Sequence, residues 1–223
     1  MTALFVIATI TIFLTVDWFL TRRKEHAAVL SAVTVKPVSN NNPVRLPEGI
    51  FFAPSHTWLN LFPSGKVRIG IDDFVLRMTN KPEITFLKRS GDLIAKGEPM
   101  MRLRDDGHEL TVYSPIEGAI ESANDELINN PDLLKQSLFQ NGWSFVIKPK
   151  HTSDLRQFIL GSESRMWIQR EFGRLRDLLA TMGKSADVSP VYLQDGGPPI
   201  ANAMEHMDEY VWKQFEQEFL QIQ

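Results

Sequence analysis

The densest group of chemically active side chains is the run "RDDGHE" at residues 104–109, which places three carboxylates and an imidazole close together. Carboxylate oxygens at close spacing are the ligands that Ca²⁺ prefers. The run lacks the number and spacing of ligands of a calcium-binding loop, however, and an Asp-Gly pair between two alternating runs is typical of a tight β-hairpin turn. We therefore predict a hairpin whose two-residue turn is Asp106-Gly107, and no metal site.

Other residue types that could do chemistry are scattered. The five histidines have no ligand-like spacing, and a lone histidine is usually a packing or surface residue. We interpret His56 and the nearby Trp58 in this way, as side chains packed against the folded domain. Because no glycine-rich phosphate loop, nucleophile elbow or catalytic triad is recognisable, the sequence predicts no catalytic, cofactor-binding or metal-binding residue, no cofactor and no enzymatic activity.

The composition argues against several partners. The 24 Lys and Arg residues against 27 Asp and Glu residues give a formal net charge of -3, so no basic field exists to attract nucleic acid. The absence of cysteine excludes disulfides and thiolate metal sites and suits a reducing compartment. We expect neither nucleic acid nor a small-molecule substrate as a partner.

The chain begins with an apolar stretch at residues 1–21. This stretch is about as long as a helix that crosses a bilayer. The basic residues of "TRRK" follow this stretch instead of preceding it, which favours a retained single-pass anchor over a signal peptide. Basic flanks stay on the cytoplasmic side. We therefore predict an inner (plasma) membrane location with everything after Arg22 in the cytoplasm. Trp18 is expected at the membrane interface, and Asp17 is either a solvated acid at the end of the helix or a polar contact with a partner helix.

The remainder divides by composition. Residues 22–50 contain an Asn run and three prolines and are predicted to be a linker. Residues 51–150 consist of short β-branched runs separated by glycine turns, which favours a small antiparallel barrel or sandwich. The predicted fold class is mainly β with α, with an N-terminal transmembrane helix and C-terminal amphipathic helices.

Residues 151–183 are predicted to form an amphipathic helix, because their apolar residues recur at steps of three and four. Arg165, Arg170 and Arg174 are candidate interaction residues that are either solvated or docked against an acidic partner or lipid headgroups. Residues 184–200 are predicted to be a loop and residues 201–223 a last helix. Phe215 and Phe219 of that helix need a surface, which could be this domain, the preceding helix or another subunit.

Several phrases of the central region occur in an order that resembles the H protein of the glycine cleavage system, a lipoyl-carrier domain folded as a flattened β-barrel or sandwich. The resemblance covers nearly half of the chain. The phrases are "SHTWL" at 55–59, "GKVRIGIDDF" at 65–74, "GDLIAKGEP" at 91–99, "VYSPIEGAIESAN" at 112–124, "NNPDLL" at 129–134 and "NGW" at 141–143.

The resemblance implies a lysine at the hairpin tip that bears the lipoyl group. Gly107 occupies that position, and no lysine occurs between Lys96 and Lys135. We therefore interpret the chain as a degenerate family member: a non-catalytic, non-lipoylated accessory subunit of a larger membrane complex, with a respiratory or electron-transfer complex as the favoured host. Its partners would be the membrane and other protein subunits. An adaptor that docks lipoate-dependent enzymes at the membrane is the alternative, and a carrier with an unusual attachment is less favoured.

Overall fold

The computed structural model describes residues 44–182, 204–205 and 207–222. The predicted anchor (residues 1–21) with Asp17 and Trp18, most of the predicted linker and the predicted loop 184–200 lie outside these residues. Within the described part of the chain, no helix combines the length and the apolar character needed to cross a membrane.

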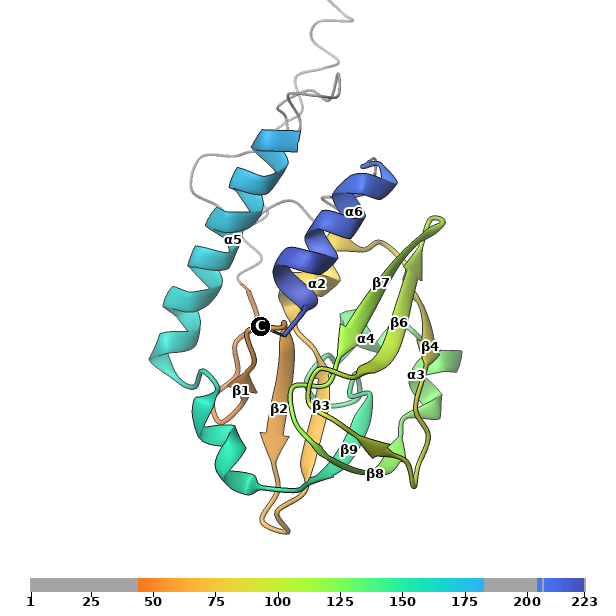
Figure 1. Cartoon of the computed structure of the whole chain (residues 1–223), viewed down its shortest axis with the longest axis vertical. Coiled ribbons are helices and arrows are strands. Elements are labelled where there is room, and N and C mark those ends of the chain that lie inside the picture. The colour runs from red at the N-terminus through yellow and green to blue at the C-terminus, as the bar shows by residue number, and fades with distance from the viewer. Residues whose placement is uncertain (1–43, 183–203, 206, 223) are drawn as a thin grey trace, which may run out of the picture. The chain divides into compact units, whose positions relative to one another are not determined.

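Two antiparallel sheets form the centre of the domain (Figure 1). The larger sheet has the order β1-β2-β3-β9-β8-β5, and the smaller has the order β4-β6-β7. The strands are β1 (Phe51–Phe52), β2 (Thr57–Leu61), β3 (Val67–Ile71), β4 (Glu83–Phe86), β5 (Leu93–Ile94), β6 (Pro99–Asp105), β7 (His108–Tyr113), β8 (Gly118–Ala123) and β9 (Phe145–Pro149). The prediction of a mainly β domain with added helices is confirmed.

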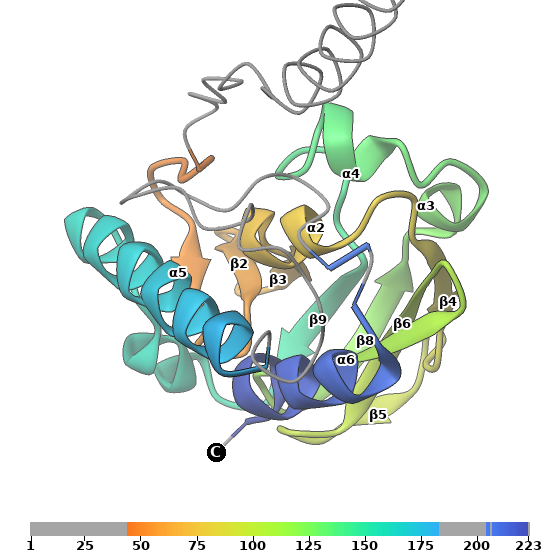
Figure 2. The ribbon, with the colours of Figure 1, turned by 90° about the horizontal axis from the view of Figure 1, so that it is seen from above.

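Helices surround the sheets (Figure 2). They are α2 (Asp73–Met78), α3 (Asp125–Asn129), α4 (Leu133–Gln136), the 3₁₀ turn η1 (Thr152–Gln157), α5 (Ser162–Met182), α6 (Glu209–Phe215) and the π-helical turn η3 (Glu216–Leu220). Figure 2 shows α5 and α6 next to each other on one side of the domain and α3 and α4 on another.

The core lies between the sheets and follows from the two-residue period of the strands. On β6 and β7, Met101, Leu103, Leu110 and Val112 point inward and are buried. Arg102, Arg104 and Glu109, which alternate with them along the strands, are exposed. A one-residue slip would turn these apolar side chains out of the core, so the alternation excludes such a shift, and the two-residue turn fixes the register of β6 and β7.

A close approach explains one glycine of β3. A Cβ atom at Gly70 would lie 2.7 Å from Cε2 of Trp58, so only glycine lets this indole lie flat across the neighbouring strand. Trp58 is fully buried there, which agrees with its interpretation as a packing residue. Phe139, in the loop before β9, packs against Trp58 on this side of the larger sheet, with the two ring centroids 5.6 Å apart.

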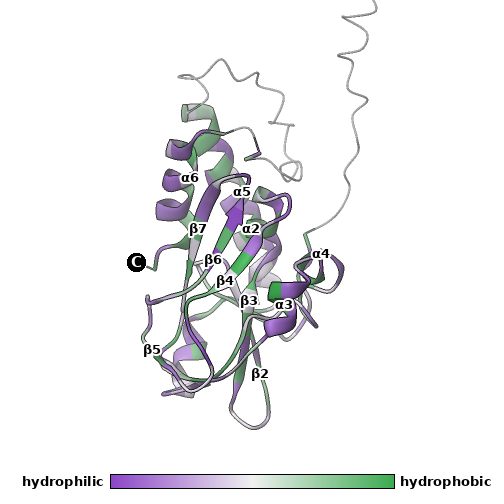
Figure 3. Cartoon of the chain, turned by 90° about the vertical axis from the view of Figure 1, so that its right-hand side faces the viewer, coloured by the Kyte–Doolittle hydropathy of each residue, from purple (hydrophilic) through white to green (hydrophobic). Residues whose placement is uncertain are grey.

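The last helix, as far as the structure describes it, begins at Glu209. The side chain of Asp208 accepts a hydrogen bond from the backbone nitrogen of Val211 and caps the helix at this point. The helical path then continues through η3 and ends at Leu220. In Figure 3 the hydrophilic residues of α6 line the side that faces away from the rest of the domain.

The amphipathic stripe of α5 lies against the core. Ile168, Phe172, Leu175 and Leu179 are buried, and Met182 at the end of the helix is partly buried. The helix occupies residues 162–182 of the predicted range 151–183, since residues 152–157 form the separate turn η1. Both α5 and α6 therefore bury their apolar faces against their own domain.

Candidate functional site

The tip of the β6–β7 hairpin has the predicted two-residue turn. Asp105 pairs with His108, and the two residues between them have positive φ angles, 48° at Asp106 and 87° at Gly107. Positive φ at both central residues belongs to the turn whose twist matches that of the flanking strands, and it favours Asp-Gly. The preference of Asp106 and Gly107 for positive φ angles is enough to explain the conformation of this turn.

Asp105 has a structural role in holding this tip. Its carboxylate is buried and accepts hydrogen bonds from the backbone nitrogens of Asn80, at 2.5 Å, and Lys81, at 2.9 Å. These contacts tie the hairpin to the loop between α2 and β4. Among the described residues, no group of three or more His, Cys, Asp or Glu side chains could hold a metal ion.

The C-terminal segment, by which we mean residues 207–222, covers the hairpin near its tip. The imidazole of His108 stacks on the indole of Trp212, with ring centroids 5.0 Å apart and planes 8° from parallel. Nδ1 of His108 lies 3.3 Å from Oε2 of Glu209. Hydrogen bonds from Lys213 and then His108 lower the pKa of the exposed Glu209 carboxyl.

Further along, the C-terminal segment covers the edge of β7. One carboxylate oxygen of Glu216 accepts a hydrogen bond from the backbone nitrogen of Thr111 at 2.8 Å, and the other lies 3.1 Å from the hydroxyl of Tyr113. Burial and the charge of Glu216 raise the pKa of Tyr113. Because β7 is an edge strand of the smaller sheet, the Thr111 nitrogen that Glu216 accepts from would otherwise be free to pair with another chain.

Phe215 and Phe219 are buried in the structure. The sequence left three surfaces open for them: this domain, the preceding helix or another subunit. Their rings lie 5.9 Å and 5.3 Å from the ring of Phe74 on α2 and 5.1 Å from each other. The surface that these phenylalanines need is supplied by their own domain.

The three candidate arginines of α5 differ. Arg165 and Arg170 are exposed and form no ion pair with the described residues, so their role as contact residues stays a prediction. Arg174 is engaged within the domain. Its guanidinium lies 2.7 Å from the Glu171 carboxylate, 3.3 Å from that of Glu218 and 4.9 Å from the ring centroid of Phe219. Arg174 thus joins α5 to the C-terminal segment.

His56 is the centre of a buried cluster. Its backbone has φ = 57° and its side chain is fully buried. Nδ1 lies 2.8 Å from Oδ2 of Asp72, and Nε2 lies 3.6 Å from Oε2 of Glu171 on α5. The imidazole is stacked between Phe74 and Trp167, at centroid distances of 3.9 Å and 5.0 Å. One imidazole therefore links the β1–β2 loop, α2 and α5.

The charges around His56 determine its protonation. Burial on its own lowers the pKa of the imidazole, but the charge and hydrogen bond of Asp72, together with Glu171, outweigh burial and raise this pKa above 6.5. Burial likewise raises the pKa of Glu171, and the opposing effects of His56 and Arg174 outweigh it, so this pKa is lowered. The imidazolium is the form that this cluster favours.

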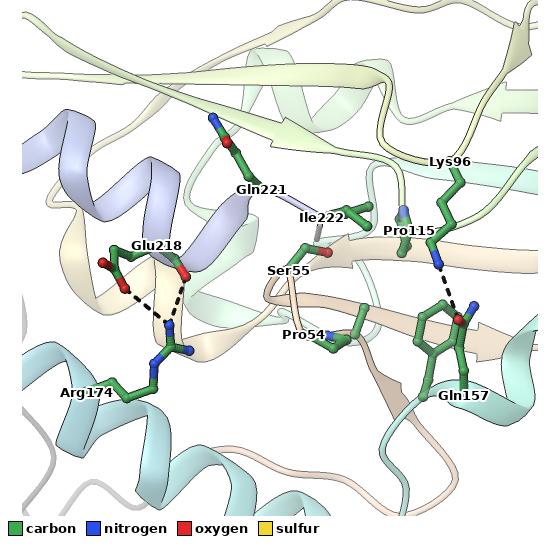
Figure 4. A pocket seen from close by; sticks show the side chains of 11 residues that line it. Pro54, Ser55, Lys96, Pro115, Gln157, Arg174, Glu218, Gln221 and Ile222 are labelled. Carbon is green, nitrogen blue, oxygen red and sulfur yellow. Dashed lines mark hydrogen bonds and ion pairs between the residues drawn. The ribbon is translucent and has the colours of Figure 1, made fainter.

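A pocket of about 410 Å³ lies beside the C-terminal segment (Figure 4). Ser55 lies at the β1–β2 loop side, Arg174 of α5 on another side, and Ile222 contributes a wall from the C-terminal segment. Lys96 reaches in from the turn before β6 and donates a hydrogen bond to Gln157 at 3.2 Å. The C-terminal segment thus shapes the pocket as well as covering the hairpin.

Sequence reasoning missed the partners of His56. Glu171 is far from His56 in the chain and Asp72 lies 16 positions away, and no spacing rule connects the three residues. The available signal was local: "IDDF" at 71–74 contains Asp72 at a position that caps a helix, where its Oδ1 accepts hydrogen bonds from the backbone nitrogens of Phe74 and Val75. A capping aspartate has a second oxygen free for another donor, which here is His56.

Comparison with known proteins identifies the family. The family model for "Glycine cleavage H-protein" matches residues 50–171. The chain is 26% identical over 126 residues to the glycine cleavage system H protein of Halalkalibacterium halodurans, covering 56% of this chain and 98% of that protein. It is 30% identical over 110 residues to the one of Chromobacterium violaceum, covering 49% and 86%.

Among solved structures, a glycine cleavage system H protein from Mycobacterium marinum matches with a TM-score of 0.41 and 19% identity, covering 47% of this chain and 87% of that one. The region matched by the family model ends within α5, so α6 and η3 lie outside it. From the two-sheet domain with the β6–β7 hairpin and the family model that matches more than half of its residues, we conclude that this chain belongs to the glycine cleavage H-protein family.

Proposed function

We propose that this protein is a non-catalytic member of the H-protein family that carries no lipoyl group and acts through contact with other proteins. In this view it is an accessory subunit of a larger membrane complex. A single-pass N-terminal anchor holds it at the inner membrane, and its two-sheet domain is on the cytoplasmic side.

The observation that carries the proposal is the chemistry of the hairpin tip. The resemblance implies a lysine amine at this position, because lipoate is attached through an amide bond. Here the tip is Asp106-Gly107, in a turn that this pair adopts readily. No lysine occurs between Lys96 and Lys135, so a small shift in alignment would not supply the amine.

The surroundings of the tip support the same conclusion. The hairpin is tied to the α2–β4 loop through Asp105 and is covered on its β7 side by Trp212 and Glu216. An arm that visits several enzymes needs a tip with free space around it. The C-terminal segment, which the family model does not match, occupies part of this space.

Two measurements test the proposal on the full chain isolated from its native membrane. We expect intact mass spectrometry to give the mass of the polypeptide alone, with lipoylated proteins of the same cells as the positive control for detection. We also expect the protein, after gentle solubilisation, to migrate as part of an assembly well above its own 25.4 kDa. A lipoyl adduct on any residue would contradict the first part, and migration as a free monomer would contradict the second.

A further inference from the structure

Arg68 lies on the face of the larger sheet opposite to that of its buried strand neighbours Val67 and Ile69. It is in the middle of β3, where its register partners are Asn60 on β2 and Val146 on β9. Its guanidinium carbon lies 5.0 Å from the ring centroid of Phe62 and 5.4 Å from that of Trp143. Two aromatic rings therefore hold this cation in place on the sheet, which reduces the side-chain entropy that it would lose on binding.

The hydrogen-bonding capacity of Arg68 is mostly unused. Nη1 donates to the backbone oxygen of Gln140 at 3.3 Å, and Nε is buried without a hydrogen-bond partner. Within the described residues Arg68 forms no ion pair, whereas Arg45, Arg102 and Arg174 each face a carboxylate. A partly desolvated guanidinium without an anion is a costly arrangement that an external carboxylate would relieve.

The surroundings of Arg68 add positive charge and apolar surface. Lys148 is two residues beyond Val146 on β9 and so lies on the same face of the strand; it is exposed and forms no ion pair with the part of the chain that the structure describes. Lys66, two residues before Arg68, is paired with Glu121. Val146 and Trp143 are only partly buried. This face therefore combines two unpaired cations with apolar groups.

We propose that the face around Arg68, formed by Phe62, Arg68, Trp143, Val146 and Lys148, is a docking surface for an acidic segment of a partner protein. The inference rests on the proposed function and names the part of the domain that makes the contact. A partner's Asp or Glu accepts hydrogen bonds from the exposed guanidinium nitrogens of Arg68, and an adjacent apolar side chain packs on Trp143. Arg and Trp are the residue types that most often dominate binding energy at interfaces.

Charge complementarity favours a protein over nucleic acid as the occupant. The unpaired charges of this face are both positive, but the chain as a whole has a formal net charge of -3, which opposes the long-range attraction of a polyanion. A short acidic segment of a protein needs only local pairing, and an aromatic-flanked arginine provides it.

The test places a photo-crosslinking amino acid, p-benzoylphenylalanine, at Lys148 of the full chain in its native membrane. The matched control carries it at Thr85, which is exposed on β4 of the other sheet. We expect the Lys148 position, and not the Thr85 position, to crosslink to one protein, at a peptide rich in Asp or Glu. Arg68→Gln is expected to lower the crosslink yield by about tenfold or more, and Arg102→Gln to leave it unchanged.

A second measurement covers the case that a crosslinking variant does not assemble. A short synthetic peptide that alternates Glu and Leu is expected to shift the NMR signals of the Arg68 and Trp143 side-chain NH groups. A matched peptide that alternates Gln and Leu, or the Arg68→Gln variant, should show no such shift.

Crosslinking to lipid or nucleic acid, a yield that does not depend on Arg68, or identical shifts with both peptides would overturn the inference. If the protein still migrates in a large assembly while these results are found, only the docking surface is refuted. If it migrates as a free monomer, the proposed function fails as well.

Discussion

Glu216 places a carboxylate oxygen 2.8 Å from the backbone nitrogen of Thr111, so a residue of the C-terminal segment satisfies an edge donor of β7. A side chain here does what a neighbouring strand does elsewhere in the sheet. The same carboxylate accepts from the hydroxyl of Tyr113, and the two contacts fix η3 along the strand.

Glu216→Ala removes both contacts and leaves the Thr111 nitrogen without its partner. We expect the free energy of unfolding to fall by about 1–3 kcal/mol, which is the cost of leaving a partly buried donor unsatisfied. Urea denaturation measures this change, and hydrogen exchange should become faster at the Thr111 amide. The exposed neighbour Gln217 provides the control, since Gln217→Ala should change stability by less than about 0.5 kcal/mol. Unchanged exchange at Thr111 in the Glu216 variant would contradict the role assigned to Glu216.

The two aspartates at the hairpin tip are expected to respond differently. Asp105→Ala removes an acceptor of two backbone hydrogen bonds and should destabilise the fold by about 1–3 kcal/mol. Asp106→Asn should be nearly neutral, because asparagine tolerates the positive φ of this position. Thermal denaturation of both variants makes the comparison. Equal effects at the two positions would show that the buried carboxylate of Asp105 does not hold the loop.

Phe215 tests whether the C-terminal segment is part of the core. Its ring is fully buried against Phe74 and Phe219, so Phe215→Ala should lower the free energy of unfolding by about 3–5 kcal/mol. Tyr210, on the exposed side of the same helix, is the control, and Tyr210→Ala should have little effect. If Phe215→Ala were as stable as the parent chain and only failed to assemble, the ring would belong to an interface and not to the core.

The pH dependence of stability follows from His56. Its pKa is raised above 6.5 in the folded protein, so the native state holds the proton more tightly than the unfolded chain does. The resulting stabilisation is fully present below about pH 6.5 and is lost as the pH rises through the native pKa. Glu171, whose pKa is lowered, adds stability that is present above its unfolded pKa and lost as the pH falls through the native value.

We therefore expect urea denaturation to show a decline in stability on the alkaline side of neutrality, and NMR titration to assign it to the His56 imidazole. Glu171→Gln keeps the shape of the side chain but removes one of the two carboxylates that face His56, so this variant should titrate at a lower pH. A His56 signal that titrates at or below 6.5 in the parent chain would contradict the cluster.

Local chemistry made part of this structure predictable. The hairpin turn depends on two adjacent residues with a strong conformational preference, Asp106 and Gly107, and it was predicted correctly. The α5 stripe is periodic over several turns, and its residues are buried as an amphipathic pattern indicates. The mainly β character followed from short β-branched runs between glycines.

The features that could not be predicted are contacts between residues that lie far apart in the chain. The contact of His56 with Glu171 and that of Thr111 with Glu216 join residues about a hundred positions apart, and no periodicity encodes such non-local contacts. For the same reason the pattern predicted that Phe215 and Phe219 need a surface without indicating which one.

The position of the C-terminal segment also affects the order in which parts of the chain fold during synthesis. During synthesis, β7 leaves the ribosome long before Glu216, and closing such a large loop is slow because its entropy cost precedes its contacts. The nascent two-sheet domain therefore passes through an interval in which its edge strand is bare. A chaperone that shields this edge, or a pause in translation, would have its effect in that interval.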